Sequence, residues 1–322
     1  MSASITPGRP LLSRISARLW RASAPLTAVG LLMLPVLALC WLGLWLDPST
    51  IAGAPAWLKP AKFAASISLY ALTLAWVFQY LPGQVRLRRS VGWTSASVFV
   101  IEIAIICLQA ARGRLSHFNT STLLDGTLFT IMGAGILLQT LASVVVAVAL
   151  WRQKFADGAL GWALRLGLCI AILGASVGGL MTRPTSEQLD AMRLGPPSVV
   201  GAHTVGAPDG GRGLPGMGWS REHGDLRVPH FFGLHALQAL PLLALGLRRG
   251  RWSEQQRIRL VLAAAASYVS LVALLFWQAL RGQPLFTPDG AMALALLAWL
   301  GLSAVLAWQV VRSERRAAAY AS

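Results

Sequence analysis

Residues 126–150 read GTLFTIMGAGILLQTLASVVVAVAL, an unbroken run without a charged side chain. At about 1.5 Å of rise per residue, a helix of this length crosses the roughly 30 Å hydrocarbon layer of a bilayer. No water is present there to satisfy backbone N–H and C=O groups, so such a run must be helical. Seven further apolar runs long enough to span a membrane are residues 26–46, 61–81, 93–111, 162–182, 230–247, 260–280 and 290–311.

The composition of the whole chain agrees with this pattern. Of 322 residues, 55% are hydrophobic and 12% are charged, and the mean hydropathy is +0.59. Average soluble domains carry about 25% charged residues. These values exclude a disordered chain, a coiled coil and a typical soluble enzyme. The sequence predicts an all-α integral membrane protein, a bundle of eight transmembrane helices.

The charge distribution predicts how this bundle is oriented. The chain carries 28 Lys and Arg against 12 Asp and Glu, a formal net charge of +16. Seventeen basic but only three acidic residues fall in the N-terminal arm, the second, fourth and sixth loops and the C-terminal tail, and an eighteenth, Arg165, lies just inside the run after the fourth loop. Cytoplasmic loops carry an excess of Lys and Arg, which places both termini in the cytoplasm. The basic charge is therefore a topology signal and does not indicate a nucleic-acid partner.

The first apolar run is expected to be retained in the mature protein. Residues 1–25 are basic and rich in serine, but the following run is longer than the roughly 7–15 apolar residues of a signal peptide. The predicted organisation is a basic cytoplasmic arm (1–25), a first four-helix half (26–150), a second four-helix half (151–311) and a cytoplasmic tail (312–322).

The two halves resemble each other when the chain is shifted by 169 residues. QAARG at residues 109–113 then aligns with QALRG at residues 278–282, and Pro60 aligns with Pro229. Four identities in five at a polar helix end favour a parallel four-plus-four internal repeat. The alternative is chance matching between two stretches that are both rich in Leu and Ala. Parallel repeats occur in transporters, and membrane redox enzymes also contain them.

The halves differ most in their first outer loop, which is residues 47–60 in the first half and residues 183–229 in the second. Thr185 and Gln188 form a capping-box pattern, which predicts a short helix over residues 187–194. The residues that follow are rich in Gly and Pro and have no apolar periodicity. This long periplasmic loop is either a lid over a site or a linker without a role.

Ionisable residues inside an apolar run are costly to bury and are therefore functional candidates. Glu102 is the clearest, and Ser95 and Gln109 share its helix face at intervals of seven. This stripe is predicted to point into the bundle, where Glu102 either relays a proton, binds an ion or fixes helix packing. Lys62 lies at the outer start of the second run, where an anionic group on protein or ligand would explain it.

The histidines all lie on the predicted outer side. His117, His230 and His235 are candidate ligands of a metal or a haem, because neutral imidazole suits Zn, Fe and Cu. His230 and His235 are five residues apart, about 140° around a helix, and so do not share a face. His235 and Gln238 alternatively form a hydrogen-bonding substrate site or a structural contact. We expect His235 to face the bundle beside Glu102, His117 or His230 and not to face lipid.

Arg112 and Arg281 occupy equivalent positions in the two halves, and each precedes an Asp-Gly pair. They are predicted to form Arg–Asp bridges at the outer helix ends, or else an anion clamp near the axis between the halves. The candidate residues for a polar site open to the periplasm are Lys62, Glu102, Arg112, His117, Asn119, His230, His235, Gln238 and Arg281.

Three motifs carry a resemblance: WLKPAKF at residues 57–63, RGRLSHFN at 112–119 and LRVPHFFGLHALQ at 226–238. They resemble motifs of a family of bacterial multi-pass inner-membrane proteins with no assigned activity, which implies a bacterial inner-membrane location and no particular chemistry. The four-plus-four plan is also similar to haem A synthase, which holds haem with paired intramembrane histidines in both halves. Here Ser66 aligns with His235, so haem-synthesis chemistry is not expected.

Three functions are open on the sequence alone. The first is binding or transport of a small solute or ion, with Lys62 and Arg112 attracting an anion and Glu102 relaying a proton. The second is a metal- or haem-dependent membrane oxidoreductase that uses the three candidate histidines. The third is a membrane scaffold or assembly factor without a small-molecule site. The expected partners are the lipid bilayer and a small anionic solute or ion.

Overall fold

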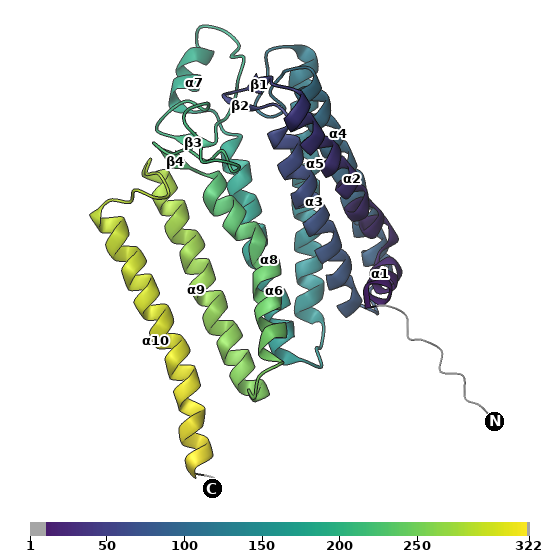
Figure 1. The fold of residues 1–322 in the computed structure, drawn as a ribbon, viewed down its shortest axis with the longest axis vertical. Coiled ribbons are helices and arrows are strands. Elements are labelled where there is room, and N and C mark those ends of the chain that lie inside the picture. The colour runs from purple at the N-terminus through teal and green to yellow at the C-terminus, as the bar shows by residue number, and fades with distance from the viewer. Residues whose placement is uncertain (1–10, 321–322) are drawn as a thin grey trace, which may run out of the picture.

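A computed structural model describes residues 11–320 as long helices lying side by side, with short strands gathered at one end (Figure 1). Among the described residues, eight helices are long and apolar enough to cross a membrane. The chain therefore fits a multi-pass membrane protein. These helices are α2 (Ala24–Leu46), α3 (Leu58–Val77), α4 (Val85–Ala111), α5 (Leu123–Arg152), α6 (Gly158–Met181), α8 (Arg227–Leu247), α9 (Glu254–Leu280) and α10 (Gly290–Tyr320).

The two ends of the bundle differ in what they carry (Figure 1). The first and last described residues lie at one end, termed the terminal end, and the longest connections lie at the other, termed the loop end. The small elements of the loop end are two antiparallel strand pairs and a short helix: β1 (Thr50–Ile51) with β2 (Ala54–Pro55), β3 (Thr204–Val205) with β4 (Gly224–Asp225), and α7 (Ser186–Met192).

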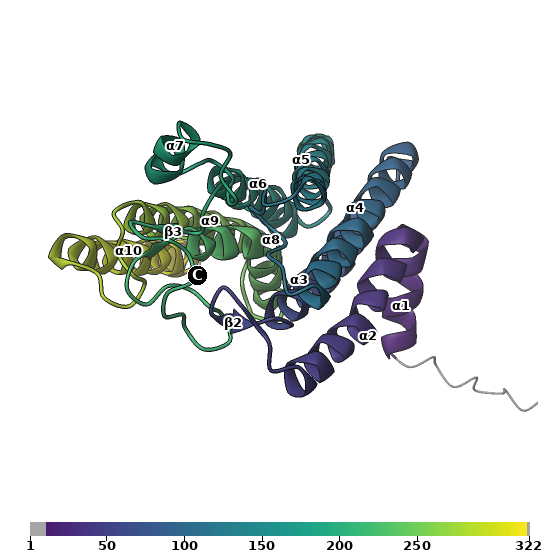
Figure 2. The same ribbon diagram turned by 90° about the horizontal axis from the view of Figure 1, so that it is seen from above.

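Helices pack in the same order in the two halves of the chain. α2 packs mainly on α3, and α4 contacts α2, α3 and α5. In the second half α6 packs mainly on α8, and α9 contacts α6, α8 and α10. The view from above shows the two groups side by side, and they meet where α5 packs on α6 (Figure 2).

The α6–α8 contact is the closest of these packing interfaces. A methyl group added at Gly174 of α6 would lie 2.7 Å from the Cα of Gly233 on α8, so only glycine fits. Small residues of this kind let two membrane helices approach backbone to backbone. This contact fixes the depth at which α8 presents its polar side chains.

The connection between α6 and α8 begins with α7. The hydroxyl of Thr185 accepts from the N–H of Gln188, and the Gln188 side chain accepts from the N–H of Thr185, at 3.2 and 3.0 Å. This is the predicted capping box, and α7 itself is confirmed with slightly different ends. The Gln188 side chain also bonds both backbone groups of Gly201, at 2.8 and 3.0 Å.

The same connection then docks on the first half of the chain. The N–H of Thr120 donates to the carbonyl of Ser198 at 2.9 Å, and the N–H of Val200 donates to the carbonyl of Phe118 at 2.8 Å. These bonds tie residues 198–200 to the loop between α4 and α5. The long connection is therefore attached to both halves across the loop end.

The N-terminal arm contains a helix that hydropathy did not predict. This helix, α1 (Leu11–Ala22), precedes the first membrane helix. Hydropathy missed it because its apolar residues alternate with arginines and form no long apolar run. Residues 1–10, with Arg9 of the predicted cytoplasmic arm, lie outside the described residues.

Several helices also extend past their predicted ends. α4 begins at Val85 and α9 at Glu254, whereas the apolar runs begin at 93 and 260. The predicted tail continues α10 as far as Tyr320, and residues 321–322 lie outside the described part. Hydropathy marks the segment in lipid, whereas the backbone hydrogen bonds continue into the polar flanks.

Candidate functional site

Glu102 lies on α4, within a membrane-spanning helix, and only 2% of its surface is exposed. Ser95 and Gln109 on the same stripe are fully buried, so the stripe points into the bundle. Glu102 Oε1 lies 3.5 Å from Nε2 of His117, yet this atom has no hydrogen-bond partner among the described residues. A buried carboxyl oxygen without a hydrogen bond is costly, which makes this atom available to a proton or a ligand.

His117 reaches Glu102 from the loop between α4 and α5. Its ring lies 5.6 Å from the ring of Phe63, 6.2 Å from that of Phe118 and 6.3 Å from that of Phe129. Phe118 adopts a positive φ of 65°, which turns the chain directly after the histidine. Three aromatic side chains therefore hold the imidazole over the carboxyl group.

The imidazole of His117 is held in its neutral form. Burial lowers its pKa well below the usual value, and the positive charge of Lys59 adds to this effect. Nδ1 lies 3.1 Å from the hydroxyl of Ser116, and Nε2 faces Glu102. A neutral imidazole can either donate or accept at Nε2, depending on its tautomer.

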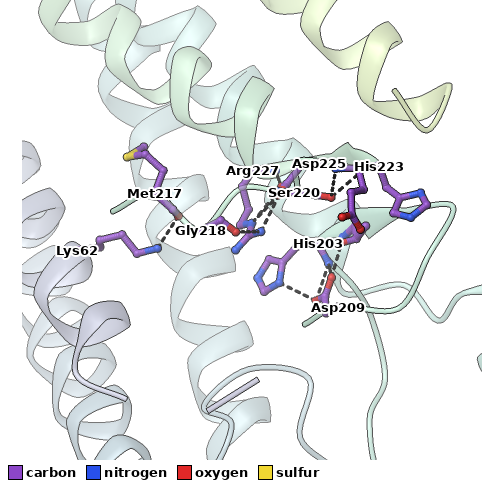
Figure 3. A network of polar contacts seen from close by, with 11 residues as sticks. Lys62, His203, Asp209, Met217, Gly218, Ser220, His223, Asp225 and Arg227 are labelled. Atoms are coloured by element: carbon purple, nitrogen blue, oxygen red, sulfur yellow. Dashed lines mark hydrogen bonds and ion pairs between the residues drawn. The ribbon is translucent and has the colours of Figure 1, made fainter. Parts of the chain in front are cut away.

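The N-terminal turn of α3 supplies two lysines to the same region. Nζ of Lys59 lies 6.0 Å from the ring centre of Phe63 and within electrostatic range of Glu102. One turn on, Nζ of Lys62 donates to the carbonyl of Met217 at 2.8 Å (Figure 3). Lys62 thus reaches from the first half of the chain to the long connection of the second.

The start of α3 is itself fixed by a short polar contact. Nε1 of Trp57 donates to Asp47 at 2.8 Å, and the N–H of Ser49 donates to the same carboxylate at 2.9 Å. These hydrogen bonds lower the pKa of Asp47, with that from Ser49 contributing most. Asp47 remains ionised and fixes the turn that leads into the two lysines.

A second acid–base pair lies in the long connection. His203 Nδ1 lies 2.8 Å from Asp209, and this carboxylate also accepts from the backbone N–H groups of His203 and Thr204 (Figure 3). Burial acts to raise the pKa of Asp209, but the hydrogen bonds from His203 and Thr204 outweigh it and hold that pKa well below its usual range. Burial lowers the pKa of His203.

Arg227 opens α8 and completes the site. Its guanidinium donates to Asp225 from Nε at 2.9 Å and from Nη2 at 2.6 Å, a bidentate pair, and Nη2 also reaches the carbonyl of Gly218 (Figure 3). Asp225 also accepts from the N–H of Ser220 at 2.7 Å. Charge-assisted bidentate pairs of this kind fix side-chain orientation firmly.

These side chains form one electrostatic unit, termed the loop-end polar cluster. Lys59 interacts with Glu102, Asp209 and Arg227, and its charge also acts on the two histidines. The cluster combines helix ends from both halves with the loop after α4 and the long connection. Its members are Lys59, Lys62, Glu102, His117, His203, Asp209 and Arg227.

Other candidates from the sequence lie outside this cluster. Arg112 forms an ion pair with Asp125 at 2.8 Å, and Arg281 forms one with Asp289 at 2.6 Å. Both arginines are therefore engaged by carboxylates at the loop end. Asn119 bonds local backbone and side-chain groups, which stabilises the turn that follows His117.

The α8 candidates form a separate group. His230 Nδ1 lies 2.8 Å from the carbonyl of Gly174 on α6, and Nε2 of Gln238 donates to Thr73 on α3 at 3.2 Å. The ring of His235 lies 4.3 Å from that of Phe231, and His235 is within electrostatic range of His230. His235 is half-buried in this group, whereas His117 contacts Glu102.

The three histidines proposed as metal or haem ligands do not converge. Among the side chains that the structure describes, no three from His, Cys, Asp or Glu lie close enough together to hold a metal ion. His230 is turned to a backbone carbonyl and His117 to Glu102. As arranged here, these three histidines do not form a three-ligand metal group.

Hydropathy and spacing missed four members of the cluster. Lys59 was interpretable as an anchor at the membrane surface, and Arg227 lay before the predicted start of its helix. His203 and Asp209 lie in a Gly- and Pro-rich segment without periodicity, so only the fold of that segment brings them to the bundle. The one available signal was their charge within a loop predicted to face the periplasm, the side to which the polar site was expected to open.

Comparisons of the chain with protein-family models, with curated proteins and with solved structures found no match.

Proposed function

We propose that this protein binds a small anionic solute or ion at the loop-end polar cluster and carries it across the membrane together with a proton. The observation that carries the proposal is the Glu102–His117 pair, in which a buried carboxyl oxygen on a membrane-spanning helix lies 3.5 Å from a neutral imidazole of the loop after that helix. In this proposal the membrane is a bacterial inner membrane, the loop end faces the periplasm and the termini lie in the cytoplasm.

The pair has the chemistry that a proton relay needs. Protonation of the Glu102 carboxyl removes its charge from the apolar bundle, and deprotonation restores a partner for the nearby Lys59. His117 can pass that proton on and remain neutral if it accepts the proton at Nε2 while Nδ1 releases another toward the Ser116 hydroxyl. Intramembrane carboxylate and histidine side chains serve in this way in pumps and transporters.

Anion binding is supported by the cations around Gly218. A methyl group added at Gly218 would lie 3.7 Å from Nζ of Lys62 and 3.9 Å from Nη1 of Arg227, so both cations flank a position without a side chain. Arg227 is neutralised by Asp225, whereas Lys62 has a backbone carbonyl as its hydrogen-bond partner. Among the described residues no carboxylate forms an ion pair with Lys62, which leaves its ammonium group open to an anionic ligand.

The long connection fits the role of a lid in this proposal. It carries His203, Asp209 and the Met217 carbonyl to the cluster, and it docks on the α4–α5 loop through backbone hydrogen bonds. Release of the Lys62–Met217 and Arg227–Gly218 bonds would free this part of the connection from the cluster while leaving the helices in place. The alternative of a linker without a role does not explain these contacts.

The test is transport by the purified protein in liposomes. A panel of inorganic phosphate, sulfate, succinate and glutamate is offered under an imposed pH gradient, and uptake is followed with radiolabel. We expect one class of anion to accumulate, Glu102→Gln to abolish the dependence on the pH gradient, and Lys62→Gln to weaken anion binding. His235→Gln is the matched control and should transport normally, because His235 lies outside the cluster.

The other two functions make different predictions in the same experiment. A metal- or haem-dependent oxidoreductase would show bound metal or visible absorption, but no observation favours it because the candidate ligands do not converge. A scaffold would take up none of the anions while folding normally. Absence of uptake across the panel, with intact protein, would therefore favour the scaffold function.

We also propose that the two halves are a parallel internal repeat. Arg112–Asp125 and Arg281–Asp289 are matching ion pairs after matching helices, and Gly113 and Gly282 follow with φ of 65° and 70°. The helices pack in the same order in both halves. The cluster then lies where the first outer connection of each half meets the other half.

A further inference from the structure

A groove at the terminal end has a different chemistry from the loop-end cluster. It lies between α1 and the start of α4, next to the end of α3. Its volume is about 220 Å³ and it is open to the outside. The residues that line it are Arg18, Arg21, Ala22, Gln79 and Arg88.

Three guanidinium groups from two helices meet in this groove without an acidic side chain among the described residues that line it. The chain contains no Asp or Glu before Asp47, so α1 itself offers none. Arg88 makes only long hydrogen bonds, to the carbonyls of Ala22 at 3.5 Å and Pro82 at 3.4 Å. Its buried Nε has no partner among the described residues.

α1 has the features of a helix that lies at a membrane surface. Arg14, Arg18 and Arg21 share one face, at intervals of four and three residues, while Leu19 packs on the apolar core. Trp20 points away from the core and is 42% exposed. A short amphipathic helix with arginines on one side and an exposed indole on another is typical of the boundary between headgroups and acyl chains.

We propose that this groove binds the phosphate of an anionic phospholipid. Each guanidinium offers forked N–H donors that match phosphate oxygens, and the missing acidic partners leave three positive charges for one anionic headgroup. A lipid is favoured over free phosphate because the groove opens at the end of membrane-spanning helices, where a bound headgroup keeps its acyl chains beside α2 and α4. This site is independent of the proposed transport function and of its substrate.

The experiment is a titration of the full-length protein with phosphatidylglycerol or phosphatidylcholine in detergent, read by native mass spectrometry. The test variant is Arg18→Gln/Arg21→Gln/Arg88→Gln. The control is Arg86→Gln/Arg89→Gln/Arg152→Gln, which removes the same charge from exposed positions at the same end, outside the groove. We expect roughly 100-fold weaker phosphatidylglycerol binding in the test variant, from about a fivefold contribution per arginine, and little change in the control.

Two further arms make the result decisive. Single Arg18→Gln and Arg21→Gln variants remove exposed side chains, so they fold even if the triple variant does not, and each should bind phosphatidylglycerol several-fold more weakly. Added inorganic phosphate should not displace the lipid at comparable concentration. Equal loss in test and control variants, equal affinity for phosphatidylcholine, or displacement by inorganic phosphate would each overturn the proposal.

Discussion

Individual residues in this protein are positioned by small local devices. His117 meets Glu102 because Phe118 takes a positive φ and three aromatic rings confine the imidazole. Lys62 reaches the long connection because it lies one turn into α3, which the Trp57–Asp47 bond holds in place. The chemistry of the site therefore depends on loop geometry as much as on the membrane helices.

The buried histidine makes stability depend on pH at the residue scale. The pKa of His117 is lowered in the folded protein, so the unfolded chain, with an ordinary pKa near about 6.5, binds the proton more readily. The contribution of neutral His117 to the free energy of unfolding is fully present above that value and is lost as the pH falls toward the lowered folded pKa. We expect the melting temperature to fall between about pH 7 and pH 5. His117→Gln should show a smaller fall, and an unchanged fall would contradict the assignment.

Asp209 makes a prediction at lower pH. Its folded pKa is lowered, so its contribution is present above the unfolded value of about 3.9 and is lost as the pH falls through the folded pKa. Asp209→Asn removes the charged acceptor of His203 and Thr204. We expect faster hydrogen exchange across the long connection at neutral pH in this variant, with the helices unaffected. Exchange equal to that of the unmodified protein would show that the pair does not hold the connection.

At the scale of elements, close helix contact sets the depth of α8. Gly174→Ala would place a methyl group 2.7 Å from the backbone of Gly233, and we expect it to cost about 1–3 kcal/mol of stability. Gly179→Ala is the matched control on α6, because nothing lies within 4 Å of the added methyl group. Alanine is a better helix former than glycine, so the control should melt at the same or a higher temperature. Equal destabilisation by both changes would contradict the close contact.

The helices and loops also show which features of the fold the sequence predicts and which it does not. Eight long apolar runs predicted the eight spans, because lipid leaves the backbone no alternative to a helix. α1 was missed because its apolar residues are interrupted by arginines and give no run. The Glu102 stripe followed from spacing alone. The positions of His203 and Arg227 beside Lys59 did not, because they arise from long-range docking of the connection, which no local pattern encodes.

At the scale of the whole molecule, both described chain ends lie at the terminal end, as an even number of spans requires (Figure 1). The charge distribution predicts that this end is cytoplasmic. Reporter fusions after Tyr320 and Val85 should report the cytoplasm, and a fusion at Gly210 should report the opposite side. A cytoplasmic Gly210 would invert the orientation and place the polar cluster at the inner surface.

The central claim is that Glu102 takes up and releases a proton beside His117. Infrared difference spectroscopy of the purified protein during acidification observes this directly, because a protonated carboxyl group buried in the bundle has its own C=O band. We predict that such a band appears in the unmodified protein, persists in Asp209→Asn and is absent in Glu102→Gln. An identical band in Glu102→Gln, or no band in the unmodified protein at any pH at which it stays folded, would contradict the account.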